Sequence, residues 1–132
     1  MTPAELAELF GSARLYRPVG VVTARRLTEP MTWYSERGAE LHAAVGDWEL
    51  VDAAGARWTV APATFARSYR PRPDGRYEKH EMVQAVRLTA PAQIPTREGL
   101  SAANRGDWVL RDSFGAVWPV PDRVFQDRYD PA

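Results

Sequence analysis

The side chains that could carry chemistry in this sequence are few and scattered. Two histidines, His42 and His80, stand far apart, and the second lies between Lys79 and Glu81, which could suggest a general base. No Ser or Cys nucleophile is placed by spacing beside either histidine, and two isolated histidines form no metal signature. We therefore predict no catalytic residues, no metal site and no cofactor.

Asp47 and Asp107 occupy the same place in two similar stretches, each directly after a glycine. Two carboxylates in related positions could approach one another and act as an acid and a base. The alternative is that each aspartate accepts backbone N–H bonds within its own tight turn, as Asp does in Asx-turns. We favour the second interpretation, because the Gly-Asp pair belongs to the motif in both stretches.

Aromatic and cationic side chains outside this motif are the candidates for a binding surface. Trp33 and Tyr34 are adjacent, and Ile94 stands where a matching aromatic residue would be expected later in the chain. The stretch from Arg67 to Lys79 is the most basic; we interpret it as a solvated connector, with nucleic-acid contact as the alternative. The predicted binding residues are Trp33, Tyr34, His42, Arg70, Arg72 and His80.

These residues must be positioned by a sequence that largely repeats itself. The segments "GDWELVDAAGARWTV" and "GDWVLRDSFGAVWPV" open two stretches, 46–71 and 106–131, that are identical at 12 of 26 positions. We predict two units over residues 17–71 and 77–132, a linker at 72–76 and an N-terminal helical segment at 1–16. Because so small a unit alone would bury only ~60% of its unfolded surface, the units should share one core about a pseudo-twofold axis.

Each unit is expected to contain a strand, a variable segment, a β-hairpin and a short helix, which makes the fold α+β. Alternation in the repeated motif predicts the hairpin, with Gly55 at positive φ in the turn. Residues 31–45 are ambiguous between a strand and an irregular turn. We assign the repeated aromatics to the core, with a stacking platform for a base or a proline-rich peptide as the alternative. They are Trp48, Trp58, Phe65, Tyr69, Trp108, Trp118, Phe125 and Tyr129.

The first ten residues predict a short amphipathic helix that docks on the rest of the chain. Thr2 and Glu5 have the spacing of a capping box, and Pro3 suits the first helical position. Leu6, Leu9 and Phe10 would form its apolar stripe. A single helix of this length is marginal alone, so it should pack on the body.

Composition narrows the class of protein. The net charge is zero, with 17 Lys plus Arg against 17 Asp plus Glu, so a general binder of the nucleic-acid backbone is not expected. The chain has no cysteine, which excludes disulfides and thiolate metal sites. No signal segment and no apolar run of the ~20 residues of a membrane span is found, and a cytoplasmic location follows by default.

The motif of Gly-Asp-Trp, a turn glycine, Trp, Phe and Tyr-x-Pro resembles the PGDYG-type domain of small bacterial and phage-borne proteins. The second copy carries it at Gly106 to Trp108, Gly115, Trp118, Phe125 and Tyr129, and the first at Gly46 to Trp48, Gly55, Trp58, Phe65 and Tyr69. Two departures stand out: Val45 and Arg105 lie where the family often has Pro, and Trp58 and Trp118 where Tyr is common. The resemblance implies a fold more than an activity.

The functional expectation is a non-catalytic binding or adaptor module, a monomer or homodimer, that recognises a protein, a peptide or a small ligand. Its support is the missing catalytic constellation, the neutral charge and the small size. The alternative is a small-ligand enzyme, possibly acting on a nucleotide-type ligand, with a cleft between the two copies.

Overall fold

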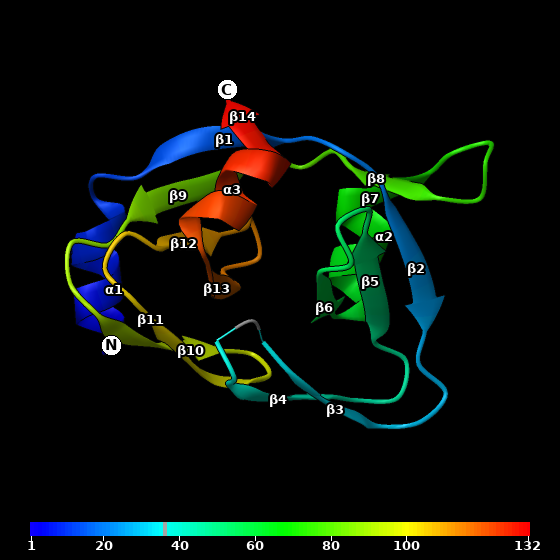
Figure 1. Ribbon diagram of the computed structural model, residues 1–132, viewed down its shortest axis with the longest axis horizontal. Helices are drawn as coiled ribbons and strands as arrows, with labels where there is room; N and C mark the ends of the chain where they lie inside the picture. The colour runs from blue at the N-terminus through cyan, green and yellow to red at the C-terminus, as the bar shows by residue number, and fades with distance from the viewer. Residues whose placement is uncertain (36) are drawn as a thin grey trace.

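The computed structural model describes residues 1–35 and 37–132 and has a mixed α+β fold (Figure 1). In these ranges the helices are α1 (Pro3–Phe10), α2 (Pro62–Ser68) and α3 (Asp122–Arg128). The strands are β1 (Arg14–Pro18), β2 (Val22–Arg26), β3 (Met31–Tyr34), β4 (Glu40–Ala43), β5 (Trp48–Asp52), β6 (Arg57–Val60), β7 (Tyr69–Pro71), β8 (Tyr77–Lys79), β9 (Val83–Arg87), β10 (Ala92–Thr96), β11 (Gly99–Ala103), β12 (Trp108–Arg111), β13 (Val117–Val120) and β14 (Tyr129–Pro131).

Two five-stranded antiparallel sheets form the body of the molecule. The N-terminal sheet has the order β6-β5-β2-β8-β7, and the C-terminal sheet has the order β13-β12-β9-β1-β14. Figure 1 shows the sheets on opposite sides of the molecule, joined below by the hairpins β3–β4 and β10–β11. The ambiguous residues 31–45 therefore contain a hairpin, β3–β4, as the corresponding residues of the C-terminal half contain β10–β11.

Each sheet contains one interior strand, next to an edge strand, that is supplied by the other half of the chain. Strand β1 pairs with β9 and β14, through Tyr16 opposite Val83 and Pro131. Strand β8 pairs with β2 and β7, through Tyr77 opposite Val22 and Pro71. The two sheets are thereby interlocked.

Because β1 and β8 each join the sheet of the other half, the boundaries of the N-terminal segment and of the linker differ from those predicted. Helix α1 ends at Phe10, and residues 14–18 of the N-terminal segment are a strand of the C-terminal sheet. Residues 72–76 form the turn of the β7–β8 hairpin. They therefore connect two strands of the N-terminal sheet and are not a linker between two units. The physical reason is that a Pro- and Gly-rich connector and a hairpin turn use the same residues, so composition does not distinguish them.

The repeated motif folds as a β-hairpin in both halves. In the first, Leu50 pairs with Trp58, and the Asp52 Oδ1 atom accepts the N–H groups of Ala54 and Ala56 at 3.0 and 2.9 Å. Gly55 has φ of 85°, a left-handed conformation that this turn requires and that glycine adopts without a Cβ clash. The local turn chemistry thus sets the hairpin register.

Aromatic side chains form the core of each half. Phe65 stacks on Trp48 with ring centroids 4.0 Å apart, and Phe125 stacks on Trp108 at the same distance. Of the eight predicted core aromatics, Phe65, Tyr69, Phe125 and Tyr129 are buried, and the four tryptophans are half-buried at the edges of these clusters. The strands β1 and β8 contribute Tyr16 and Tyr77 to the same clusters, so the exchange is part of the packing.

Helix α1 covers one face of the C-terminal sheet only. Phe10 packs with Val86 and Val109, and the predicted capping box is present, with Thr2 and Glu5 exchanging both hydrogen bonds. At the places of the N-terminal sheet that correspond to Val86 and Val109 stand Arg25 and Glu49, which form an ion pair at 3.0 Å. A charged face needs no apolar cover, and in the described residues this sheet has no helix equivalent to α1.

Candidate functional site

A cleft of about 170 Å³ lies between the two sheets and is lined by both halves of the chain. We call it the inter-sheet cleft. The edge strands β6 and β13, helices α2 and α3 and the hairpins β3–β4 and β10–β11 all contribute residues to its lining. Its lining includes three pairs of residues that match in the repeated motif, Trp58 with Trp118, Val60 with Val120, and Tyr69 with Tyr129.

Two tyrosine hydroxyls provide hydrogen-bonding groups among these apolar walls. The Trp58 Nε1 atom donates to the Tyr69 hydroxyl at 3.4 Å, and the Lys79 Nζ atom donates to the Tyr129 hydroxyl at 3.4 Å. Burial raises the pKa of both tyrosines, and for Tyr69 the nearby Lys79 ammonium offsets part of that rise. Both hydroxyls are therefore protonated at neutral pH and can donate a hydrogen bond.

A cation lies over two of the indole rings that line the cleft, those of Trp58 and Trp118. The Arg128 guanidinium is 4.1 Å from the Trp58 ring centroid, and its Nε donates to Asp52 Oδ2 at 3.0 Å. The Lys79 ammonium is 4.9 Å from the Trp118 ring centroid. Cations over aromatic faces are attracted by the ring quadrupole, so both side chains are held in place at the cleft.

The position in α2 that corresponds to Arg128 is Ser68, and a different contact replaces the ion pair there. Ser68 Oγ donates to Glu81 Oε2 at 2.6 Å, and the other Glu81 oxygen accepts the Ser113 N–H at 3.1 Å and the Ser113 hydroxyl. Burial acts to raise the pKa of Glu81, but the hydrogen bonds from Ser113 and Ser68 outweigh it, and the pKa lies below its usual value.

Two ion pairs link the halves in reciprocal fashion at the cleft. Arg37 forms a bidentate ion pair with Asp107, in which Nε donates to Oδ2 at 2.8 Å and Nη2 donates to Oδ1. Arg97 Nη2 donates to Asp47 Oδ2 at 2.8 Å. Each buried aspartate also accepts a backbone N–H three residues earlier, from Ala44 or from Asn104, at 2.9 Å. The turn role favoured from the sequence is therefore present, and each carboxylate additionally faces an arginine of the other half.

Glu98, beside Arg97 in the cleft, is the lining carboxylate with a raised pKa. Burial raises it, and the Arg97 guanidinium, 3.2 Å away, offsets only part of that effect. A carboxyl whose pKa is higher folded than unfolded makes stability fall as pH rises above its unfolded value. Glu98→Gln is expected to raise the free energy of unfolding at pH 7, measured by urea denaturation.

At a pH well below the ordinary value of 4.5 for a glutamate, the Glu98 carboxyl of the wild type is protonated in both the folded and the unfolded state, and the gain from Glu98→Gln should disappear. Glu29→Gln, at an exposed position, is the matched control and should change little at either pH. An equal gain at both pH values would contradict the assignment of the effect to charge burial.

The predicted binding residues form two separate groups. Trp33 lines the inter-sheet cleft, and its Nε1 donates to Thr59 Oγ1 at 3.1 Å. Tyr34, 64% exposed, and His42 lie on the same hairpin, β3–β4, where both contact Glu40. Arg70, Arg72 and His80 lie on or beside the β7–β8 hairpin, which is at the top of the view in Figure 1, whereas β3–β4 is at the bottom.

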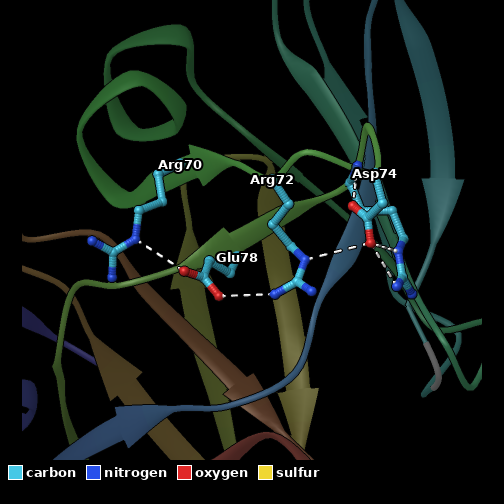
Figure 2. Close-up of polar contacts among 5 residues, drawn as sticks. Arg70, Arg72, Asp74 and Glu78 are labelled. Carbon is cyan, nitrogen blue, oxygen red and sulfur yellow. Dashed lines mark hydrogen bonds and ion pairs between the residues drawn. The ribbon is translucent and has the colours of Figure 1, made fainter.

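The arginines of the β7–β8 hairpin are paired within it, as Figure 2 shows. Glu78 accepts from Arg70 Nε at 3.0 Å and from Arg72 Nη1 at 3.3 Å. Arg72 Nε lies 3.5 Å from Asp74, close enough for an ion pair but without hydrogen-bond geometry. Hydrogen bonds from Arg76 lower the pKa of Asp74 to about 2, so this hairpin carries its own counter-charges. A cation cluster that is paired in this way offers little to a phosphate backbone.

Sequence reasoning missed Lys79, Glu98 and Arg128 as cleft residues. One signal was available for Lys79, which is the only lysine beside 16 arginines. Among residues 1–35 and 37–132, no three His, Cys, Asp or Glu side chains are grouped so that they could hold a metal ion. None of the helices in those ranges has the length and apolar character needed to cross a lipid bilayer.

Comparison of the chain with protein-family models, with curated proteins and with solved structures finds no match. The geometry of the cleft is therefore the basis for a functional proposal.

Proposed function

We propose that this protein is a non-catalytic binding module that holds a small ligand in the inter-sheet cleft. The observation that carries the proposal is the cleft itself, apolar at Trp58, Trp118 and Val120 and provided with hydroxyl donors at Tyr69 and Tyr129. Ligand sites are typically concave, mostly apolar and equipped with a few convergent polar groups. A cytoplasmic location and a monomeric or homodimeric state belong to the same proposal.

We also infer that the chain arose by duplication and that its halves are related by a pseudo-twofold axis. Support comes from matching backbone hydrogen bonds, such as Leu27 N–H to Asp47 C=O and Leu88 N–H to Asp107 C=O, both 2.8 Å long. Another pair joins the halves, Val19 N–H to Arg128 C=O and His80 N–H to Ser68 C=O. Kinship with the PGDYG-type domain stays a prediction from the shared motif.

A cleft-filling variant tests the binding proposal. Thr64 lies on α2 and lines the cleft, whereas Ala63 is exposed on the same helix and does not. A library of small ring compounds is screened by NMR, with the indole N–H signals of the five tryptophans as the readout. The screen should yield ligands that shift the signals of Trp58 and Trp118. Thr64→Trp is expected to weaken such a ligand by about tenfold or more, a loss of ~1.4 kcal/mol, because the new side chain occupies the space.

Ala63→Trp is the matched control and should leave the affinity unchanged, since it adds the same side chain outside the cleft. Ligands that shift only other signals, or that bind Thr64→Trp as well as the wild type, would contradict a site in the cleft. A protein or peptide partner then becomes the better interpretation, with Trp33 and Tyr34 as its contacts.

Catalysis is the second candidate, and Glu98 is the observation in its favour, because a carboxyl with a raised pKa in a cleft can act as an acid or a base. Neither His42 nor His80 lines the cleft, and Glu98 is held by Arg97. The proposal of a binding module therefore has the broader support.

A further inference from the structure

Lys79 is the one lysine of the chain, and it reaches into the cleft from the exchanged strand β8. Its ammonium contacts the Tyr129 hydroxyl at 3.4 Å and lies over the rings of Trp118 and Tyr129, with centroid distances of 4.9 and 5.7 Å. In the corresponding place of β1 the chain has Pro18. The positive charge of Lys79 therefore has no counterpart at the matching position of the other half.

The Lys79 ammonium has no carboxylate within ion-pair distance among residues 1–35 and 37–132. The arginines of the cleft differ in this respect: Arg128 binds Asp52, Arg97 binds Asp47 and Arg57 binds Glu49. Glu81 is close enough to Lys79 to feel its charge, but both of its oxygens are engaged by Ser68 and Ser113. A half-buried cation among aromatic rings with no counter-ion is costly and attracts an anion.

The groups around this ammonium suit one negative charge rather than two. The Tyr69 and Tyr129 hydroxyls are protonated and can donate to an anion, but Asp112 also lines the cleft and is close enough to raise the pKa of Tyr129. Asp112 is fixed by the N–H groups of Phe114 and Ala116, which donate to its Oδ1. A dianion such as a phosphate monoester would be repelled by this carboxylate more strongly than a carboxylate monoanion.

The size of the cleft limits the rest of the ligand. Its volume of about 170 Å³ is close to the ~150 Å³ of an engineered apolar cavity that binds benzene. A single planar ring against the indoles of Trp58 and Trp118 therefore fits, and a nucleotide does not.

We propose that the cleft binds a small organic acid made of one ring and one carboxylate, with the carboxylate on the Lys79 ammonium and the ring against the cleft tryptophans. This assignment rests on the proposed binding function and narrows it to a ligand class. Lys79 and the tyrosine hydroxyls select the charge, and the apolar walls select the ring.

Benzoate and benzyl alcohol test the proposal as a pair of probes that differ in charge but hardly in shape. Both are titrated against the indole N–H signals of the wild type, of Lys79→Met and of Arg76→Met. Arg76 is an exposed cation of the β7–β8 turn and does not line the cleft. The wild type and Arg76→Met are expected to bind benzoate at least about tenfold more tightly than benzyl alcohol, and Lys79→Met should lose that preference.

A measurement on the wild type alone guards against a Lys79→Met chain that fails to fold. Raising the salt from about 0.01 to about 1 M shortens the Debye length from ~30 to ~3 Å and should weaken benzoate but not benzyl alcohol. Equal affinity for the two probes, or a preference that survives in Lys79→Met, overturns the anion assignment. If benzyl alcohol still binds and Thr64→Trp prevents its binding, the proposed binding function holds although the anion assignment is wrong. If neither probe binds, the proposal of a ring carboxylate is wrong, and the screen of ring compounds tests the binding function separately.

Discussion

A chain that begins at Val19 is expected to lose its cooperative unfolding transition. The deletion removes β1, the strand between β9 and β14, and so leaves β14 without the strand that joins it to the rest of the C-terminal sheet. It also removes Tyr16, whose ring lies 4.9 Å from Phe125 and 5.5 Å from Trp108. The loss should exceed about 5 kcal/mol, the lower end of the total stability of small domains, so thermal unfolding by circular dichroism should show no sharp transition.

Two further experiments distinguish the effect of losing β1 from the effect of losing α1. A chain that begins at Ser12 lacks α1 but keeps β1, and it should stay folded with reduced stability because the strand ladder and Tyr16 remain. Adding a peptide of residues 1–18 to the chain that begins at Val19 should restore the transition, whereas the same peptide with Tyr16→Ser should restore it poorly. An unaltered transition after the deletion would show that β1 does not hold the C-terminal sheet together.

Phe125→Ala is expected to lower the free energy of unfolding by about 3–5 kcal/mol, the usual cost of deleting a fully buried aromatic side chain. Phe125 is 1% exposed and stacks on both Trp108 and Tyr129, so no neighbour is free to fill the space. Urea denaturation followed by tryptophan fluorescence measures the loss.

Phe65→Ala in the N-terminal half should cost a similar amount, because Phe65 makes the same contacts with Trp48 and Tyr69. Phe114→Ala is the control. Phe114 is 38% exposed, and its contact with Arg67 is a surface cation–π pair worth about 1 kcal/mol or less. A loss for Phe125→Ala no larger than that for Phe114→Ala would contradict the assigned core.

The local features of the fold could be predicted from the residues that form them. The hairpin turn at Gly55 and the capping box at Thr2 and Glu5 depend on neighbours only a few positions away, and both are present. The short helices between Pro62 and Tyr69 and before Tyr129 follow from local spacing as well. One further signal was present: Pro119, which lacks an N–H donor, marks β13 as an edge strand, and β13 is an edge of its sheet.

The predicted binding residues show the limit of that reasoning. Trp33 lines the cleft, but Arg70 and Arg72 are paired within their own hairpin, because Glu78 and Asp74 lie on the facing strand and in the turn. Lys79 belongs to the stretch that the sequence predicts to be a solvated connector, but it pairs with Tyr69 in the sheet and lines the cleft. Charge runs in a sequence do not reveal which cations have partners.

The repeated hairpins, their turns and the aromatic residues around which each half packs follow from the order of the residues, since these features depend on short-range chemistry and on alternation along one strand. Packing between distant residues, in contrast, places β1 in the C-terminal sheet and β8 in the N-terminal sheet, and it forms a cleft between β6 and β13. A short strand such as 14–18 or 77–79 can complete either sheet with the same local geometry. The choice rests on which aromatic cluster receives Tyr16 and which receives Tyr77, and that is a property of packing between residues far apart in the chain.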